Sequence, residues 1–170
     1  MRNLYLLRHA KSSWKDDSLA DFERPLSGRG TKACALIARF IVSENLDFDL
    51  AISSTAIRAR ETVDLIKQRA KLRTEIRYDE RIYEANASRL LQVISEIESE
   101  KKSVVLVGHN PGFEELMLSI SEERLLIPTA ALAQINLKVS KWSDNLVGKG
   151  TLAWIVRPKE LEDENGTGKR

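Results

Sequence analysis

The sequence predicts a layered α/β fold built on a largely parallel β-sheet, because short apolar runs alternate with longer amphipathic segments. The runs over 4–7 and 104–107 are apolar at every position, which is typical of parallel strands that are covered on both faces. Each of these runs leads into a histidine, and His9 and His109 are the only two histidines in the chain.

The other elements follow from the same periodicities. Residues 12–27 are polar and irregular, and Ser27 is suited to be the N-cap of the helix that follows. Further strands are expected over 49–52, 74–78, 131–139 and 150–156. Helices are expected over 28–44, from just after Ser54 to Ala70, over 87–99, and from Pro111, which suits the first position of a helix. The residues from Lys159 to Arg170 are polar, and we expect them to form a frayed tail.

Composition and charge narrow the class of protein. The chain has 170 residues, enough for one domain with a substantial core, and its net charge of +2 does not favour nucleic acid or a membrane as partner. Cys34 is the single cysteine, so no internal disulfide can form. The apolar run near the N-terminus is too short for a signal peptide, and no run reaches transmembrane length. These features predict a cytoplasmic protein.

Three predicted strand ends carry residues suited to binding an anion. Arg8 and His9 follow the first strand, Arg58 lies in the first turn of the helix after the second, and His109 follows the strand that starts at Ser103. Such positions meet at the carboxyl edge of a parallel sheet. A cation at a helix N-terminus is unfavourable unless an anion lies beside it, and the helix after Asn110 would add backbone N–H donors. The pattern predicts a phosphate site.

Two other interpretations were weighed against this site. Taken singly, a strand-end histidine is commonly a structural hydrogen-bonding residue, and arginines such as Arg58 and Arg60 are commonly solvated surface charges. A metal site would need ligands beyond the two histidines. The carboxylates that could add to it are Asp16, Asp21 and Glu84. A divalent cation would, however, be repelled by Arg8 and Arg58, so the phosphate site is favoured.

Three motifs, in order, resemble the signature of the histidine phosphatase (phosphoglycerate mutase-like) superfamily. They are Leu7-Arg8-His9-Ala10, Ser54-x-x-x-Arg58-Ala59-x-x-Thr62 and Gly108-His109-Asn110-Pro111. The segments that resemble the SixA-type phosphohistidine phosphatase branch are Arg24-Pro25-Leu26-Ser27-x-x-Gly30, Tyr83-Glu84-Ala85 and Val107 to Gly112. The resemblance extends from residue 3 to about 158. It implies a histidine phosphatase domain over 1–158, a three-layer α/β/α sandwich around a mostly parallel mixed sheet.

The resemblance also implies a mechanism. His9 would be the nucleophile that attacks phosphorus and becomes a transient phosphohistidine. Arg8, Arg58 and His109 would hold the three equatorial oxygens and stabilise their charge in the transition state. Water would then hydrolyse the intermediate, with no metal or other cofactor required.

The sequence departs from the family pattern at two positions. Mutase-like members have an Asn several residues after the Arg-His pair, and the comparable residue here is Lys15, with Ser12 nearby as a donor. Ser12, Lys15 and Asn110 are therefore the candidate substrate-binding residues. Glu84 lies where larger members carry a general acid, but its Tyr-Glu-Ala context differs. A general acid and an exposed loop carboxylate are equally compatible with that position.

The short predicted connections leave little chain for a lid over the site. An open site favours a phosphorylated protein as substrate, and in particular phosphohistidine on a protein such as a phosphotransfer domain. A small phosphorylated metabolite, cleaved by the same chemistry, is the first alternative. A non-catalytic module that binds phosphorylated partners is the second, and a scaffold with structural histidines is the third.

Overall fold

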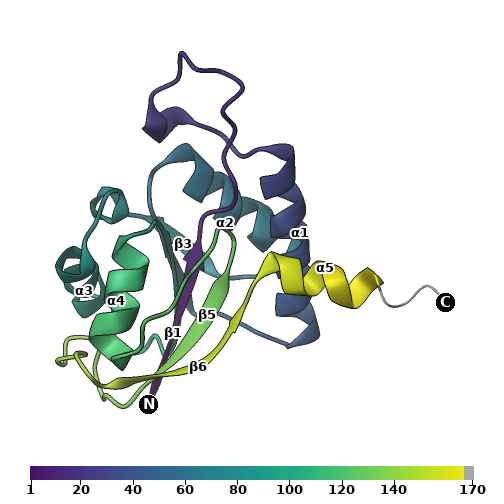
Figure 1. Ribbon diagram of the computed structural model, residues 1–170. Helices are drawn as coiled ribbons and strands as arrows, with labels where there is room; N and C mark the ends of the chain where they lie inside the picture. The colour runs from purple at the N-terminus through teal and green to yellow at the C-terminus, as the bar shows by residue number, and fades with distance from the viewer. Residues whose placement is uncertain (167–170) are drawn as a thin grey trace.

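Residues 1–166, the part of the chain that the computed structural model describes, fold around a six-stranded mixed β-sheet (Figure 1). The strand order is β3-β2-β4-β1-β5-β6. The strands are β1 (Arg2–Arg8), β2 (Leu50–Ser53), β3 (Glu75–Tyr78), β4 (Ser103–Gly108), β5 (Leu132–Leu137) and β6 (Gly150–Val156). β1, β2, β3 and β4 run parallel to one another, whereas β5 is antiparallel to both β1 and β6. This is the mostly parallel mixed sheet that the sequence predicts.

Helices cover both faces of the sheet, which gives the expected three layers (Figure 1). One face carries α3 (Ala87–Ser95) and α4 (Gly112–Ser121), and the other carries α1 (Gly28–Ser43), α2 (Ile57–Ala70) and α5 (Pro158–Gly166). Two short 3₁₀ helices, η1 (Asp21–Glu23) and η2 (Glu80–Ile82), lie in the connections. No helix within the described residues is both long and apolar enough to span a membrane.

The apolar run of β1 is explained by burial on both faces. Leu4 and Leu6 pack in the core beneath α3 and α4, whereas Tyr5 and Leu7 pack beneath α1 and α2. Successive side chains of a strand point to opposite faces, so a strand covered on both sides is apolar at every position. The segment 9–27 then extends beyond the carboxyl end of β1 (Figure 1).

Two helix boundaries differ from the sequence prediction. Helix α3 ends at Ser95 and not at residue 99, because the chain tightens there into i to i−3 hydrogen bonds at Glu96 and Ile97. Ile97 still packs in the core, so its apolar character reflects burial and not continued helix. Pro111 is the N-cap of α4, one position before the first helical residue.

The expectation of a frayed tail from residue 159 is wrong for its first part, which belongs to α5. Leu161 packs against the core on the side of α1. The carboxylate of Glu160 accepts hydrogen bonds from the backbone N–H and the guanidinium of Arg157, at 3.0 and 3.1 Å. Packing and a capped first turn therefore stabilise a segment that is polar in sequence. Residues 167–170 lie outside the described residues.

Candidate active site

The carboxyl edge of the sheet brings Arg8, His9, Arg58 and His109 together. β1 and β4 pair in register, Arg8 opposite Gly108, so His9 and His109 leave the sheet at the same level. Their ring centroids are 5.0 Å apart. Arg58, in the first turn of α2, lies between them, with Nε 3.4 Å from His9 Nε2 and Nη2 3.5 Å from His109 Nδ1.

The orientation of His9 is set by the chain that follows it. Its Nδ1 lies 2.8 Å from the carbonyl oxygen of Ala10, an acceptor, so Nδ1 carries the proton and the lone pair is on Nε2. The N–H of Ala10 donates to Thr62 Oγ1, whose hydroxyl donates to the Arg58 carbonyl oxygen at 2.6 Å. Thr62 therefore ties the His9 backbone to the helix that carries Arg58.

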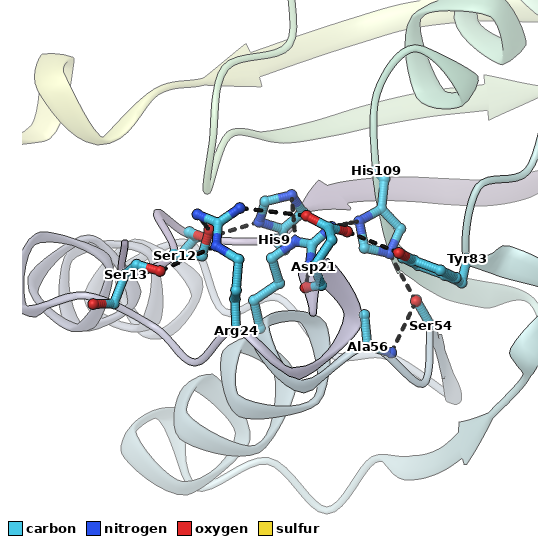
Figure 2. A network of polar contacts seen from close by, with 11 residues as sticks. His9, Ser12, Ser13, Asp21, Arg24, Ser54, Ala56, Tyr83 and His109 are labelled. Carbon is cyan, nitrogen blue, oxygen red and sulfur yellow. Dashed lines mark hydrogen bonds and ion pairs between the residues drawn. The ribbon is translucent and has the colours of Figure 1, made fainter. Parts of the chain in front are cut away.

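His109 is held by a serine at the end of β2. Its Nε2 lies 2.7 Å from Ser54 Oγ, which also accepts the N–H of Ala56 (Figure 2). Since a guanidinium can only donate, His109 Nδ1 accepts from Arg58 and Nε2 donates to Ser54. The ring of Tyr83 packs edge-on against His109, with centroids 5.5 Å apart.

Both histidines are held neutral. Burial lowers the pKa of His9 to about 4, and the positive charges of Arg58 and Arg8 act in the same direction. Burial, His9 and Arg58 together lower the pKa of His109 to about 3. A neutral imidazole keeps a lone pair, which is the state that nucleophilic attack requires of a histidine.

Arg8 is oriented by a network that the sequence did not reveal. Its Nη1 donates to the carbonyl oxygen of Ile127 at 3.0 Å, and Asn110 Nδ2 donates to the same oxygen at 2.9 Å. Glu114 Oε1 accepts from Asn110 Nδ2 and from the Ile127 N–H, both at 2.9 Å. Arg8 Nε is buried and has no hydrogen-bond partner among residues 1–166.

Asp21 is a site residue that the sequence analysis named only as a possible metal ligand. From η1, its carbonyl oxygen accepts from Arg58 Nη1 at 2.7 Å, and its Oδ2 accepts from Arg58 Nη2 at 3.0 Å and from the Tyr83 hydroxyl at 2.8 Å (Figure 2). Partial burial opposes ionisation, but the hydrogen bonds from Tyr83 and Arg58 outweigh it, so the pKa of Asp21 lies below its usual value. Asp21 is the anion that offsets Arg58 at the N-terminus of α2.

The remaining candidate residues lie around this centre, and their roles stay predictions. Ser12 Oγ accepts from Arg24 Nη2 at 2.7 Å, and the exposed Lys15 donates its backbone N–H to Ser13 Oγ. Both donor hydrogens of the Asn110 amide are directed at Ile127 and Glu114.

Glu84 is exposed and lines a cavity of about 340 Å³ beside His109. Within residues 1–166, no group of three or more His, Cys, Asp or Glu side chains is arranged to hold a metal ion.

Comparison with known proteins identifies the family. The sequence model of the histidine phosphatase superfamily (branch 1) matches residues 4–103, which include Arg8, His9 and Arg58. An uncharacterized chloroplastic protein of Arabidopsis thaliana is 30% identical over 162 residues, covering 90% of this chain and 74% of that protein. The chain belongs to the histidine phosphatase superfamily, and it is a phosphatase.

The solved structures agree with the SixA-type resemblance. SixA of Agrobacterium tumefaciens, assigned as a phosphohistidine phosphatase, superposes with a TM-score of 0.80 at 29% identity, covering 92% of this chain and 98% of that chain. The protein histidine phosphatase SixA complexed with tungstate also has a TM-score of 0.80, at 20% identity, covering 94% of this chain and 99% of that chain, which shows the shared fold.

Proposed function

We propose that this phosphatase removes the phosphoryl group from phosphohistidine on a protein, through a covalent intermediate on His9. The observation that carries the proposal is the state of the His9 ring. Its Nδ1 is directed at the Ala10 carbonyl oxygen, so the lone pair of Nε2 points towards Arg58, where a phosphoryl group would be bound. Burial keeps the ring unprotonated, since the pKa is lowered to about 4.

The groups around His9 are suited to bind the phosphoryl oxygens. Arg58 and Arg8 supply guanidinium groups, whose planar set of N–H donors is suited to phosphate oxygens. His109 borders the same space. Fixed positive charge around a transferring phosphoryl group stabilises the charge that develops in the transition state.

Two steps complete the reaction. In the first, His9 Nε2 forms a bond to phosphorus, and the substrate nitrogen leaves with the electron pair of its P–N bond. In the second, water adds to the phosphoryl group as the His9–phosphorus bond breaks. The electron pair returns to Nε2, and the product is dihydrogen phosphate. No step requires a group beyond these residues and water.

Two observations support a protein as the substrate. The Agrobacterium tumefaciens relative, 29% identical, is assigned as a phosphohistidine phosphatase. Trp14, on the segment that extends over the site, is 71% exposed, with the Arg24 guanidinium stacked on its ring. Large exposed aromatic residues are enriched where proteins bind one another. We further propose that the chain acts on cytoplasmic partners.

The proposal is tested by comparing substrates. Phosphate release is measured from a protein phosphorylated on histidine, from a phosphoserine peptide and from a phosphosugar, with the wild type and with His9→Ala. We expect the phosphohistidine protein to have the highest kcat/KM and His9→Ala to be inactive on all three.

Each alternative predicts a different result. Faster hydrolysis of the phosphosugar than of the phosphohistidine protein would support a small-molecule phosphatase. Binding of the phosphohistidine protein without phosphate release would support a binding module. Failure of tungstate to bind would support a structural role for the two histidines. Any of these three results would overturn the proposal.

A further inference from the structure

Asp21 acts on the site through its contacts with the guanidinium of Arg58. Two of the guanidinium nitrogens, Nη1 and Nη2, donate to the carbonyl oxygen and the carboxylate of Asp21. This leaves Nε directed at His9, while Nη2 also approaches His109. Tyr83 fixes the carboxylate from the other side at 2.8 Å. The carboxylate is therefore held in a fixed position in the site, and Arg58 connects it to His9.

The space in front of this carboxylate is where the rest of a substrate would lie. A cavity of about 340 Å³ adjoins His109 and is lined by both Asp21 and Arg58. A substrate whose phosphoryl group is bound beside His9 and His109 would extend into this cavity, because His109 and Arg58 line it. Two further carboxylates, Glu84 and Glu115, line the same cavity. The Asp21 carboxylate is also paired with Arg24 at 3.3 Å, so two guanidinium groups share its charge.

An ionised carboxylate in this position discriminates between leaving groups. Asp21 is held ionised by Arg58 and Tyr83, so it accepts hydrogen bonds and has no proton to donate. The oxygen of a phosphate ester needs a proton as it leaves. The imidazole of a phosphohistidine can enter already protonated, with a positive charge and an N–H that a carboxylate stabilises.

We propose that Asp21 is a specificity-determining residue, which selects a protonated, positively charged phosphoramidate such as phosphohistidine over phosphate esters. The inference rests on the proposed function. The charges balance in the transfer step: the substrate enters as a phosphorylated imidazolium, its P–N electron pair goes to the leaving nitrogen, and it departs as neutral imidazole. His9, bonded through Nε2 to phosphorus and protonated on Nδ1, takes over the positive charge.

The test compares a phosphoramidate with an ester whose leaving group needs no proton. The probes are a phosphohistidine peptide with otherwise uncharged residues and p-nitrophenyl phosphate. We expect Asp21→Asn to lower the ratio of the two kcat/KM values, phosphohistidine over ester, by about tenfold, the scale of one charge interaction near a protein surface. Asp21→Glu keeps the charge and is expected to keep the ratio, even where altered geometry lowers both rates.

Two further variants complete the design. Glu84→Gln, which changes no hydrogen bond to Arg58, is expected to lower the same ratio by a smaller factor, because it removes another negative charge from the cavity. Glu44→Gln removes an exposed carboxylate just past the far end of α1, and it should leave both rates unchanged.

The outcomes separate this inference from the function on which it rests. If Asp21→Asn and Glu84→Gln leave the ratio unchanged while the wild type hydrolyses both probes, Asp21 only positions Arg58 and this inference is overturned alone. If the wild type hydrolyses the ester but not the phosphohistidine peptide, the proposed function is wrong, whatever the variants do. A wild type that hydrolyses neither probe would overturn both.

Discussion

His9 and His109 lie beside positive charge, and each keeps a lone pair. Burial removes the solvent that would stabilise an imidazolium, and Arg8 and Arg58 make protonation still less favourable. The groups facing the pair include one negative charge, Asp21, which acts weakly in the opposite direction. The site is therefore positive in its guanidinium groups and neutral in its two histidines.

The first prediction concerns the titration of these rings. Because the chain has only two histidines, NMR of ring resonances reports them without overlap. We expect both to remain neutral down to pH 5, with the pKa of His9 about 4 and that of His109 about 3. A ring that titrates near 6.5 in the folded protein would contradict the electrostatic account.

The same shifts predict how stability depends on pH. Between pH 6.5 and about 4, the unfolded chain binds a proton on His9 that the folded chain does not, so stability falls as pH falls through this window. Above pH 6.5 the contribution is constant. The loss due to His9 is about 3 kcal/mol by pH 4. Urea unfolding of the wild type and of His9→Gln at a series of pH values measures this loss. If the free energy of unfolding depended equally on pH in the two proteins, the assignment to His9 would be contradicted.

At the scale of residues, the sequence predicts the centre of the site and not its support. Arg8, His9, Arg58 and His109 are predictable because each lies next to a strand end, and strand ends of a parallel sheet converge. Asp21 is not predictable in this way. It lies in an irregular segment, and its contacts to Arg58 and Tyr83 depend on how residues 9–27 cross the site. No periodicity encodes that path.

Among the elements, the start of α4 is placed by a close backbone approach. A Cβ at Gly112 would collide with the carbonyl oxygen of Ala85. This approach brings the segment that contains Tyr83 and Glu84 against the end of β4, next to His109. Only glycine permits it, which gives the Gly112 position a physical reason beyond helix initiation.

The third prediction follows from this contact. We expect Gly112→Ala to lower the free energy of unfolding by about 1–3 kcal/mol, because the Ala85 backbone must move. We also expect it to lower kcat/KM by about tenfold or more, since Tyr83 moves with it. Urea unfolding and p-nitrophenyl phosphate hydrolysis measure the two effects.

Gly28→Ala is the matched control for that substitution. Gly28 is also the first residue of a helix, but a Cβ there would meet nothing within 4 Å. Its stability and rate should therefore match those of the wild type or slightly exceed them. Equal effects of the two substitutions would show that the close approach does not position the site.

Element boundaries show which sequence signals are reliable. Ser27 is the N-cap of α1 as predicted, with its Oγ accepting the Gly30 N–H, because capping is local chemistry. The end of α3 and the existence of α5 were missed because they depend on tertiary packing. Ile97 is buried without being helical. Leu161 packs against the core although its neighbours in the sequence are polar.

On the scale of the whole molecule, the amino and carboxyl ends of the parallel strands have different roles. At the amino end of β1, Arg2 is buried and donates to the carbonyl oxygens of Ser99, Lys101 and Ser140, which ties connecting segments to the sheet. At the carboxyl end, Arg8 and His9 face the site. The parallel strands are buried on both faces of the sheet, so they hold Arg8 and His9 in fixed positions.

The most direct test of the account is a search for phosphate on His9 during turnover. The wild type and His9→Ala are mixed with a phosphohistidine protein and quenched in alkali within the first turnovers, and the phosphorylated residue is located by mass spectrometry. The account predicts acid-labile, alkali-stable phosphate on His9 of the wild type, none on His9→Ala, and inorganic phosphate accumulating only with the wild type. Phosphate release by His9→Ala at the wild-type rate, or label on any residue other than His9, would contradict it.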